Sequence, residues 1–120
     1  MSIQDMFNTA VAGLASQEFE RSVTENKINA SPSSCLYRGP NGLKCAIGHC
    51  LKDSEIVYDG DKQEYASATN LNAAAKYTVS HNSVRELQMA HDRSRKPADM
   101  RQALIEYAVN YNLVLPDVLK

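Results

Sequence analysis

Apolar residues recur every three or four positions near the start of the chain, which is the spacing of one face of an α-helix. The positions are Ile3, Met6, Phe7, Ala10, Val11 and Leu14. Ser2, with Asp5 three residues later, resembles a capping box at a helix N-terminus. The pattern therefore predicts a helix that packs one face on a core and leaves a polar face to water, formed by Gln4, Asn8, Thr9 and Gln17.

Three further segments are predicted to be helical in the rest of the chain. Residues 46–51 favour a short helix and the alanine-rich residues 66–76 a longer one. Pro97 fits the first turn of a last long helix, because that position needs no backbone N–H. The apolar face of this last helix comprises Met100, Ala103, Leu104, Tyr107, Ala108 and Tyr111. The tail that follows, residues 113–116, is expected to dock as extended chain.

One more helix is predicted before the last one, because Val84, Leu87 and His91 share a helical face. Asn82 or Ser83 is expected to open it, since short polar side chains cap free N–H groups at a helix start. On this interpretation His91 is a packed helix residue that forms hydrogen bonds.

Polar segments are expected to connect these helices. Residues 20–34 end in a run rich in Ser, Asn and Pro, which is typical of a loop. Residues 53–64 are acidic and polar, with a turn predicted at residues 59–61. No internal repeat is visible, so the sequence predicts one domain over residues 1–120.

The segment between Cys35 and Cys45 predicts a β-hairpin. Pro40 suits the second position of a type I turn and Asn41 the third, while Gly42 accepts the positive φ that follows. Short strands at residues 35–38 and 43–45 would flank this turn. Since an isolated hairpin is not stable, it must lean on the helices. The predicted fold class is mainly α (α+β), with four to five helices packed around one short β-hairpin.

Composition and charge exclude several classes of protein. Hydrophobic residues make up 43% and charged residues 22%, as in an ordinary globular protein. The net charge is -1, which provides no overall field to attract nucleic acid or an anionic membrane. No run of about 18 apolar residues is present, so no membrane-spanning segment is expected. The start of the chain also lacks the pattern of a signal peptide. These features together predict a cytoplasmic protein.

At the predicted hairpin and at His91 the chain resembles a known group of proteins. The strings Cys35-Leu36-Tyr37-Arg38-Gly39, Gly42-Leu43-Lys44-Cys45-Ala46-Ile47-Gly48 and Leu87-Gln88-Met89-Ala90-His91-Asp92 are similar to a family of small, mostly uncharacterised proteins of tailed phages and prophages. The order of the elements is also similar. The resemblance implies a phage origin and a life in the cytoplasm of the infected bacterium, and it implies no particular activity.

The same two motifs contain the best-clustered polar groups of the chain. Turn amides and a guanidinium can together hold a phosphate or carboxylate, and a tyrosine can stack on a base. We therefore predict that the hairpin and the helix carrying His91 meet to form a ligand-binding surface, with Asp92 holding Arg38 in place until an anion arrives. The candidate residues are Tyr37, Arg38, Gly39, Asn41, Gly42, Lys44, His91, Asp92 and Arg93. The competing interpretation is an ordinary hairpin whose Arg and Lys are solvated.

Two other kinds of site remain alternatives. A zinc site would have to draw scattered ligands from Cys35, Cys45, His49, Cys50, His81, His91 and Asp92, and no Cys-x-x-Cys pair exists. A small hydrolase would need a Cys-His-Asp set. Because neighbours on a helix point about 100° apart, Asp92 is not expected to orient the His91 ring. We expect reduced, buried Cys35 and Cys45 and no metal or cofactor.

These observations lead to one functional hypothesis. The chain is expected to be a non-enzymatic, phage-encoded binding protein with a counter-defence role in the host. It would either sequester a nucleotide-like anionic ligand or mask a host defence protein. A zinc-stabilised interaction module and an unrecognised small hydrolase are the alternatives. Nucleic acid is not an expected partner, because too few basic and aromatic residues cluster. The alanines at 73–75 permit self-association as an alternative to internal packing.

Overall fold

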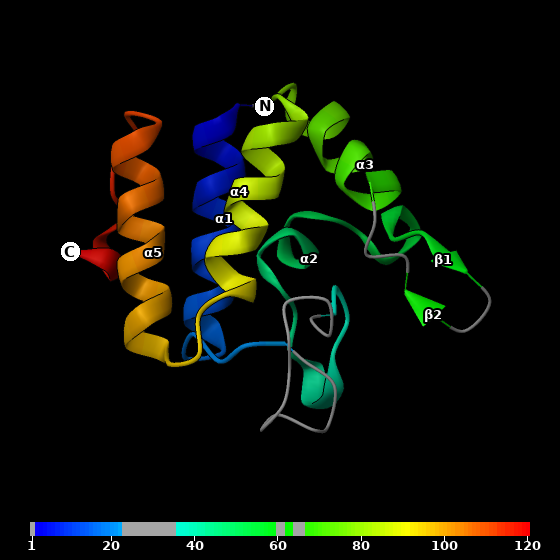
Figure 1. Cartoon of the computed structure of the whole chain (residues 1–120), viewed down its shortest axis with the longest axis horizontal. Coiled ribbons are helices and arrows are strands. Elements are labelled where there is room, and N and C mark those ends of the chain that lie inside the picture. Colours follow the sequence, from blue (N-terminus) through cyan, green and yellow to red (C-terminus); the bar gives the residue numbers. More distant parts are fainter. Residues whose placement is uncertain (1, 23–35, 60–61, 64–66) are drawn as a thin grey trace.

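The protein is built from five α-helices in the part of the chain that the structure, a computed structural model, describes (Figure 1). The described residues are 2–22, 36–59, 62–63 and 67–120. The helices are α1 (Ile3–Ser16), α2 (Ala46–Cys50), α3 (Ser67–Tyr77), α4 (His81–Asp92) and α5 (Pro97–Asn110). Three short 3₁₀ turns lie between or after them, namely η2 (Pro40–Gly42), η3 (Asp53–Glu55) and η4 (Asp117–Leu119).

The helix ends follow the local chemistry of the chain. Ser2 and Asp5 form the predicted capping box at the start of α1, and Pro97 is the predicted first residue of α5. The prediction that Asn82 or Ser83 opens α4 is wrong. Ser80 is the actual cap, because its hydroxyl accepts the Ser83 backbone N–H at 3.1 Å, as a capping serine should.

The predicted β-hairpin between Cys35 and Cys45 is absent, so the predicted fold class is wrong. Residues 40–42 do form a turn, closed by one backbone hydrogen bond from Gly39 N–H to the Leu43 carbonyl at 2.7 Å. No ladder continues from it in residues 36–45, which are described, whereas Cys35 lies outside the described residues. The fold is helical.

The flanks of this turn do not pair with each other because their backbone groups find other partners. The Gln17 side chain both accepts from Lys44 N–H at 3.1 Å and donates to the Lys44 carbonyl at 2.7 Å. Leu36 N–H donates to the Ser22 carbonyl at 2.9 Å. With these groups taken, a strand pair would gain no further hydrogen bonds.

The extended pairing that is present lies elsewhere and is minimal. β1 (Tyr58–Asp59) pairs antiparallel with β2 (Lys62–Gln63), in the register Tyr58 to Gln63 and Asp59 to Lys62. Strands of two residues each are too short to form a sheet layer that could bury one face against the helices. The pairing therefore does not change the helical class of the fold.

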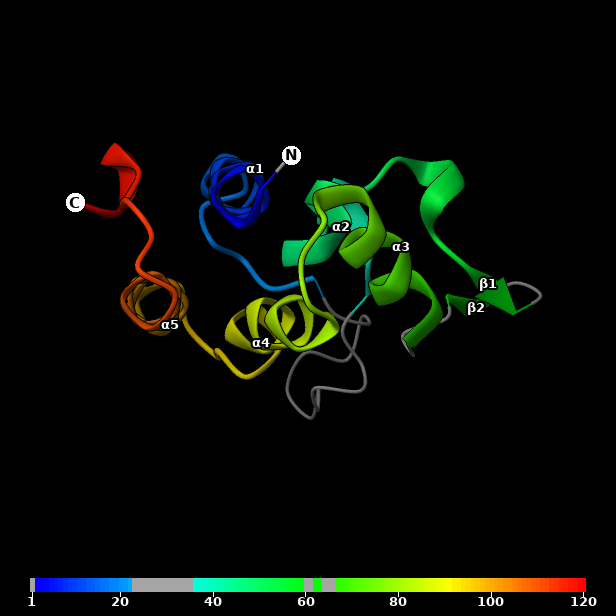
Figure 2. The same cartoon turned by 90° about the horizontal axis from the view of Figure 1, so that it is seen from above.

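The core is formed where α1 packs on α2 and where α4 packs on α2, α3 and α5. Figure 2 shows α1 lying over the space between α4 and α5, with α2 beside it. The Phe7 ring of α1 stacks on Tyr107 of α5 with centroids 5.6 Å apart, which joins the first and last helices. The fully buried side chains include Met6, Phe7, Leu14, Ile47, Val84, Leu87, Met100 and Leu104.

Glycine at position 48 is required by a close approach of two segments. A Cβ atom there would collide with the backbone carbonyl oxygen of Tyr37. This oxygen belongs to the main chain and cannot rotate away. Gly48 therefore lets α2 lie directly against the chain that leads into the η2 turn, and it sets the position of Arg38 beside α2.

Candidate functional site

His91 and Asp92 form a buried hydrogen-bond network. The Ser22 backbone N–H donates to His91 Nε2 at 2.9 Å, so the ring proton must sit on Nδ1, which donates to Asp92 Oδ1 at 2.8 Å. Gln88 Nε2 donates to the same Asp92 oxygen at 2.9 Å, and Gln88 Oε1 accepts from Ile47 N–H at 3.0 Å. The network links α4 to the start of α2 and to the chain after α1.

This geometry corrects the expectation that Asp92 does not orient the His91 ring. Asp92 is the last residue of α4, and Gln88 lies one turn earlier on the same helix. Hydrogen bonds from both Gln88 and His91 hold the carboxylate against the ring. Because both His91 ring nitrogens are engaged, neither is left to take a proton from a cysteine thiol. His91 is also fully buried. A Cys-His-Asp hydrolase centred on His91 therefore has no geometric support.

Arg38 supports the end of α2. Its Nη1 donates to the Gly48 carbonyl at 2.7 Å and its Nη2 to the Leu51 carbonyl at 2.7 Å. Its Nε pairs with Asp53 Oδ1 at 2.6 Å, and this contact holds the Asp53 pKa below its usual value. The predicted pairing of Arg38 with Asp92 is thus wrong, because Asp53 is the carboxylate that reaches Arg38. The guanidinium satisfies carbonyls that the short helix leaves open.

Tyr37 and Gly39 also have internal roles. The Tyr37 side chain is buried, and its hydroxyl donates to Asn70 Oδ1 at 2.8 Å, which attaches the chain before η2 to α3. At Gly39 a Cβ atom would collide with the Ser22 hydroxyl. The two predicted motifs do meet, because Ile47 N–H donates directly to Gln88 Oε1. Ser22 joins them at a second place, where it contacts Gly39 on one side and His91 on the other.

Three of the predicted ligand residues, Asn41, Gly42 and Lys44, share an open hollow between the end of α1, the η2 turn and α2. Its volume is about 540 Å³. The other residues that line it are Ser16, Gln17, Glu18, Glu20, Leu43 and His49. Asn41 and Gly42 have φ values of 59° and 76°, so both lie in the left-handed region of backbone conformation.

His49 is the neutral member of the hollow. Its Nε2 lies 2.8 Å from Gln17 Oε1, which is a pure acceptor, so the ring nitrogen donates. Burial lowers the His49 pKa to about 4, and the nearby positive charge of Lys44 acts in the same direction. Near neutral pH the hollow therefore combines one ammonium group, an uncharged imidazole and the two carboxylates of Glu18 and Glu20.

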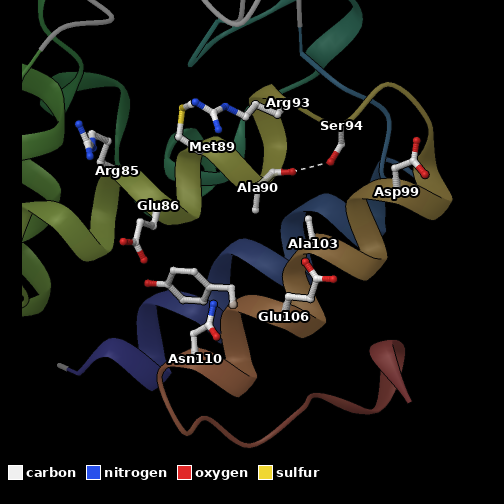
Figure 3. Close-up of a pocket in the computed structure, with 11 residues that line it drawn as sticks. Arg85, Glu86, Met89, Ala90, Arg93, Ser94, Asp99, Ala103, Glu106 and Asn110 are labelled. Carbon is white, nitrogen blue, oxygen red and sulfur yellow. Dashed lines mark hydrogen bonds between the residues drawn. The ribbon is translucent and has the colours of Figure 1, made fainter.

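Arg93 lies apart from this hollow, on a groove between α4 and α5 with a volume of about 720 Å³ (Figure 3). The residues that line the groove are Arg85, Glu86, Met89, Ala90, Arg93, Ser94, Asp99, Ala103, Glu106, Tyr107 and Asn110. Figure 3 shows Ala90 and Ala103 facing each other across its middle. The predicted site residues are thus divided among a buried network, an open hollow and a separate groove.

The cysteines and histidines that the structure describes show no arrangement that would hold a metal. No group of three or more His, Cys, Asp or Glu side chains is placed to bind an ion, as far as the chain is described. Cys45 caps α2, with its sulfur accepting from Gly48 N–H at 3.3 Å, and burial raises the Cys50 thiol pKa to about 12. Neither feature favours a zinc ligand or a nucleophile, both of which need the thiolate.

Several residues of the hollow and the groove were missed from the sequence. Gln17 was assigned to the solvent face of its helix, yet it bonds to Lys44 and His49. No local signal marks a helix-terminal glutamine as a bridge to a turn so far along the chain. Asp99 and Glu106 are spaced for one face of the last helix, and that spacing was a usable signal.

Comparison of the chain with protein-family models, with curated proteins and with solved structures finds no match. Among the described helices, none is both long enough and apolar enough to cross a membrane.

Proposed function

We propose that this chain is a non-enzymatic binding protein that masks a protein partner, and that the hollow around Asn41, Gly42 and Lys44 is its recognition site. The observation that carries this proposal is the composition of the hollow. It is open, it is polar, and it brings Lys44 together with Glu18 and Glu20 around an uncharged His49. Such mixed polarity suits a protein surface loop, which offers amide, cationic and anionic groups together.

A nucleotide-like anion has less support as the ligand. Arg38, the strongest candidate for holding a phosphate, uses its guanidinium on three carbonyls and on Asp53. Lys44 is left as a cation of the hollow, but Glu18 and Glu20 lie on the same rim and would repel a phosphate. A protein partner avoids this repulsion by placing a basic group beside the two carboxylates.

A phage origin completes the proposal. The resemblance of the two motifs to small proteins of tailed phages supports a partner in the cytoplasm of the infected bacterium, where the chain would have a counter-defence role. A buried network that joins α2, α4 and the chain after α1 supports such a role, because a small masking protein needs a rigid scaffold behind an exposed turn.

The experiment compares capture of host proteins by the wild-type chain and by surface variants. Lys44→Glu and Asn41→Arg change the rim of the hollow, whereas Lys120→Glu makes the same charge change as the first at the exposed C-terminus. We expect one host protein to be enriched by wild type and by Lys120→Glu, and to be lost with both rim variants.

Two results would contradict the proposal. The first is equal enrichment by all four proteins, which would place the recognition site elsewhere. The second is a nucleotide-sized mass that stays bound to the purified wild type in native mass spectrometry and is lost in Lys44→Glu.

A phage from which this gene has been deleted should also plate less well on a host that carries the captured defence protein than on a host that lacks it.

A further inference from the structure

The groove between α4 and α5 has walls of opposite charge. The α4 wall carries Arg85 and Arg93, and the α5 wall carries Asp99 and Glu106 (Figure 3). Glu86 also lies on the α4 side, and its carboxylate keeps its charge while it accepts the Tyr111 hydroxyl at 2.6 Å. The α4 wall thus has two guanidinium groups against one carboxylate, whereas the charged groups of the α5 wall are both carboxylates.

The charges on the two walls have matching spacing. Arg85 and Arg93 are eight residues apart, or about 12 Å along a helix, and Asp99 and Glu106 are seven residues apart, or about 10.5 Å. The two helices are antiparallel and are joined by the short segment after Arg93. Arg93 and Asp99 therefore lie near the joined end of the pair, and Arg85 and Glu106 lie further along it.

These charges are not neutralised by one another within the chain. All four residues have exposed or half-buried side chains, and none of the ion pairs found among the described residues joins Arg85 or Arg93 to Asp99 or Glu106. Two charged walls that face the same groove without pairing are suited to an external partner with the same spacing of opposite charges.

The floor of the groove allows a close approach. Ala90 and Ala103 are small, and Met89 is a flexible apolar side chain beside them. Tyr107 forms a rigid base, because its ring stacks on Phe7 and its hydroxyl donates to the Ser83 carbonyl at 2.9 Å. A helical surface can therefore settle on this face without moving the scaffold below it.

We propose that the partner on this face is a second copy of the chain. A two-fold axis that runs along the groove, parallel to the helices, places α4 of each copy opposite α5 of the other at the same height. Arg93 then faces Asp99 of the second copy, and Arg85 faces Glu106 of the second copy. One set of residues supplies both halves of the contact, as a two-fold symmetric interface requires.

This dimer goes beyond the proposed function and does not depend on it. The hollow around Lys44 is lined by α1, the η2 turn and α2, so none of its residues lies in the proposed interface. A dimer would present two such hollows to a partner, which strengthens binding to any target with two copies of the recognised surface.

Sedimentation equilibrium on charge-reversed variants tests the proposal. We expect wild type to dimerise, and the association constant to fall at least tenfold in Arg85→Glu/Arg93→Glu, whose two walls are both negative. It should fall similarly in Asp99→Arg/Glu106→Arg, whose walls are both positive. An equimolar mixture of the two variants should form a heterodimer, because opposite walls face each other again.

The controls separate loss of pairing from loss of folding. Lys52→Glu/Lys120→Glu makes the same change in net charge as the arginine variant at exposed residues outside the groove, and it should dimerise like wild type. Asp99 also lies in the first turn of α5, where a carboxylate stabilises the helix. The double variant Asp99→Asn/Glu106→Gln removes the two negative charges without reversing them, so it disturbs the start of α5 less. Circular dichroism checks that each variant is folded.

Three outcomes would overturn the proposal. Wild type that remains monomeric at the highest concentration measured excludes the dimer. A dimer that is insensitive to both reversals lies on another face. Reversed variants that dissociate but fail to form a heterodimer when mixed exclude the two-fold arrangement of opposite walls.

Discussion

His91 Nε2 lies 2.9 Å from the backbone nitrogen of Ser22 and accepts its N–H, although the two residues are 69 positions apart. This hydrogen bond holds the chain that leaves α1 against the end of α4. Arg21 adds a second contact at the same place, because its Nη1 donates to the Asp92 carbonyl at 2.8 Å. His91 thus acts as a structural hydrogen-bond acceptor that stabilises the fold, and its buried side chain does not line an open site.

Replacing His91 should therefore destabilise the protein strongly. In His91→Ala the Ser22 N–H and the Asp92 carboxylate each lose a buried partner, and a cavity remains where the ring was. We expect a loss of about 3 kcal/mol in the free energy of unfolding, measured by urea denaturation. His81→Ala is the matched control, because His81 Nε2 has no hydrogen-bond partner in the described structure, and it should cost about 1 kcal/mol or less. Equal losses in both variants would argue against the network.

Arg38 should behave as a structural residue, in contrast to its predicted role in holding an anion. Arg38→Lys keeps the charge but cannot reach three carbonyls and a carboxylate with one ammonium group. We expect about 2 kcal/mol lower stability by thermal and urea unfolding. Asp53→Asn removes only the exposed partner and should leave the thermal midpoint nearly unchanged. If Arg38→Lys unfolds like wild type, the guanidinium contributes little to holding α2.

The low pKa of His49 predicts a dependence of stability on pH. Burial lowers this pKa to about 4 in the folded protein, from about 6.5 when the chain is unfolded. Above pH 6.5 the ring is neutral in both states and has no effect. As the pH falls from 6.5 to 4 the unfolded chain takes up the proton first, so stability falls through this window.

A variant isolates the contribution of His49 from that of the other titrating groups. His49→Gln keeps a donor for Gln17 but does not titrate. The difference in unfolding free energy between wild type and His49→Gln should therefore change between pH 6.5 and pH 4, in favour of the variant at the acid end. A difference that stays constant over this range would show that the His49 pKa is close to its ordinary value.

The cysteines of α2 should be inert in the folded protein. Cys45 and Cys50 are both buried, which shields them from reagents, and burial raises the Cys50 pKa to about 12, so almost no Cys50 thiolate forms at pH 8. Cys35 lies outside the described residues, and a Cys35→Ser background removes it from the assay. We expect no reaction with Ellman's reagent in the native state and two reactive thiols in denaturant. Rapid native labelling of either cysteine would mean that α2 opens readily.

The sequence predicted most helices because their signals are local. The apolar spacing of α1 and its capping box involve residues within a few positions of each other, as does Pro97 at the start of α5. The cap of α4 was displaced because several short polar residues precede that helix, and only the hydrogen bond to Ser83 identifies Ser80. Local patterns identify a helix more reliably than they identify its first residue.

The candidate site was predictable only as a set of polar residues. The described part of the Cys35 to Gly48 motif and the His91 motif do meet, directly between Ile47 and Gln88 and also through Ser22, which contacts both Gly39 and His91. The sequence could not show which polar groups would be buried, because that depends on the packing of α1, α2 and α4 around them. Asn41, Gly42 and Lys44 line the hollow, whereas Arg38 is half-buried against α2 and His91 is fully buried.

What the sequence determined by itself was the order of helices and the turn at Pro40-Asn41-Gly42, since both follow from backbone preferences of neighbouring residues. The tertiary structure decided whether that turn would close a hairpin. Gln17, at the end of α1, takes both backbone groups of Lys44 and so removes the partners that a second strand would need. Nearly every buried backbone N–H and carbonyl group forms a hydrogen bond. The partner of each group depends on which residues the tertiary fold brings next to it.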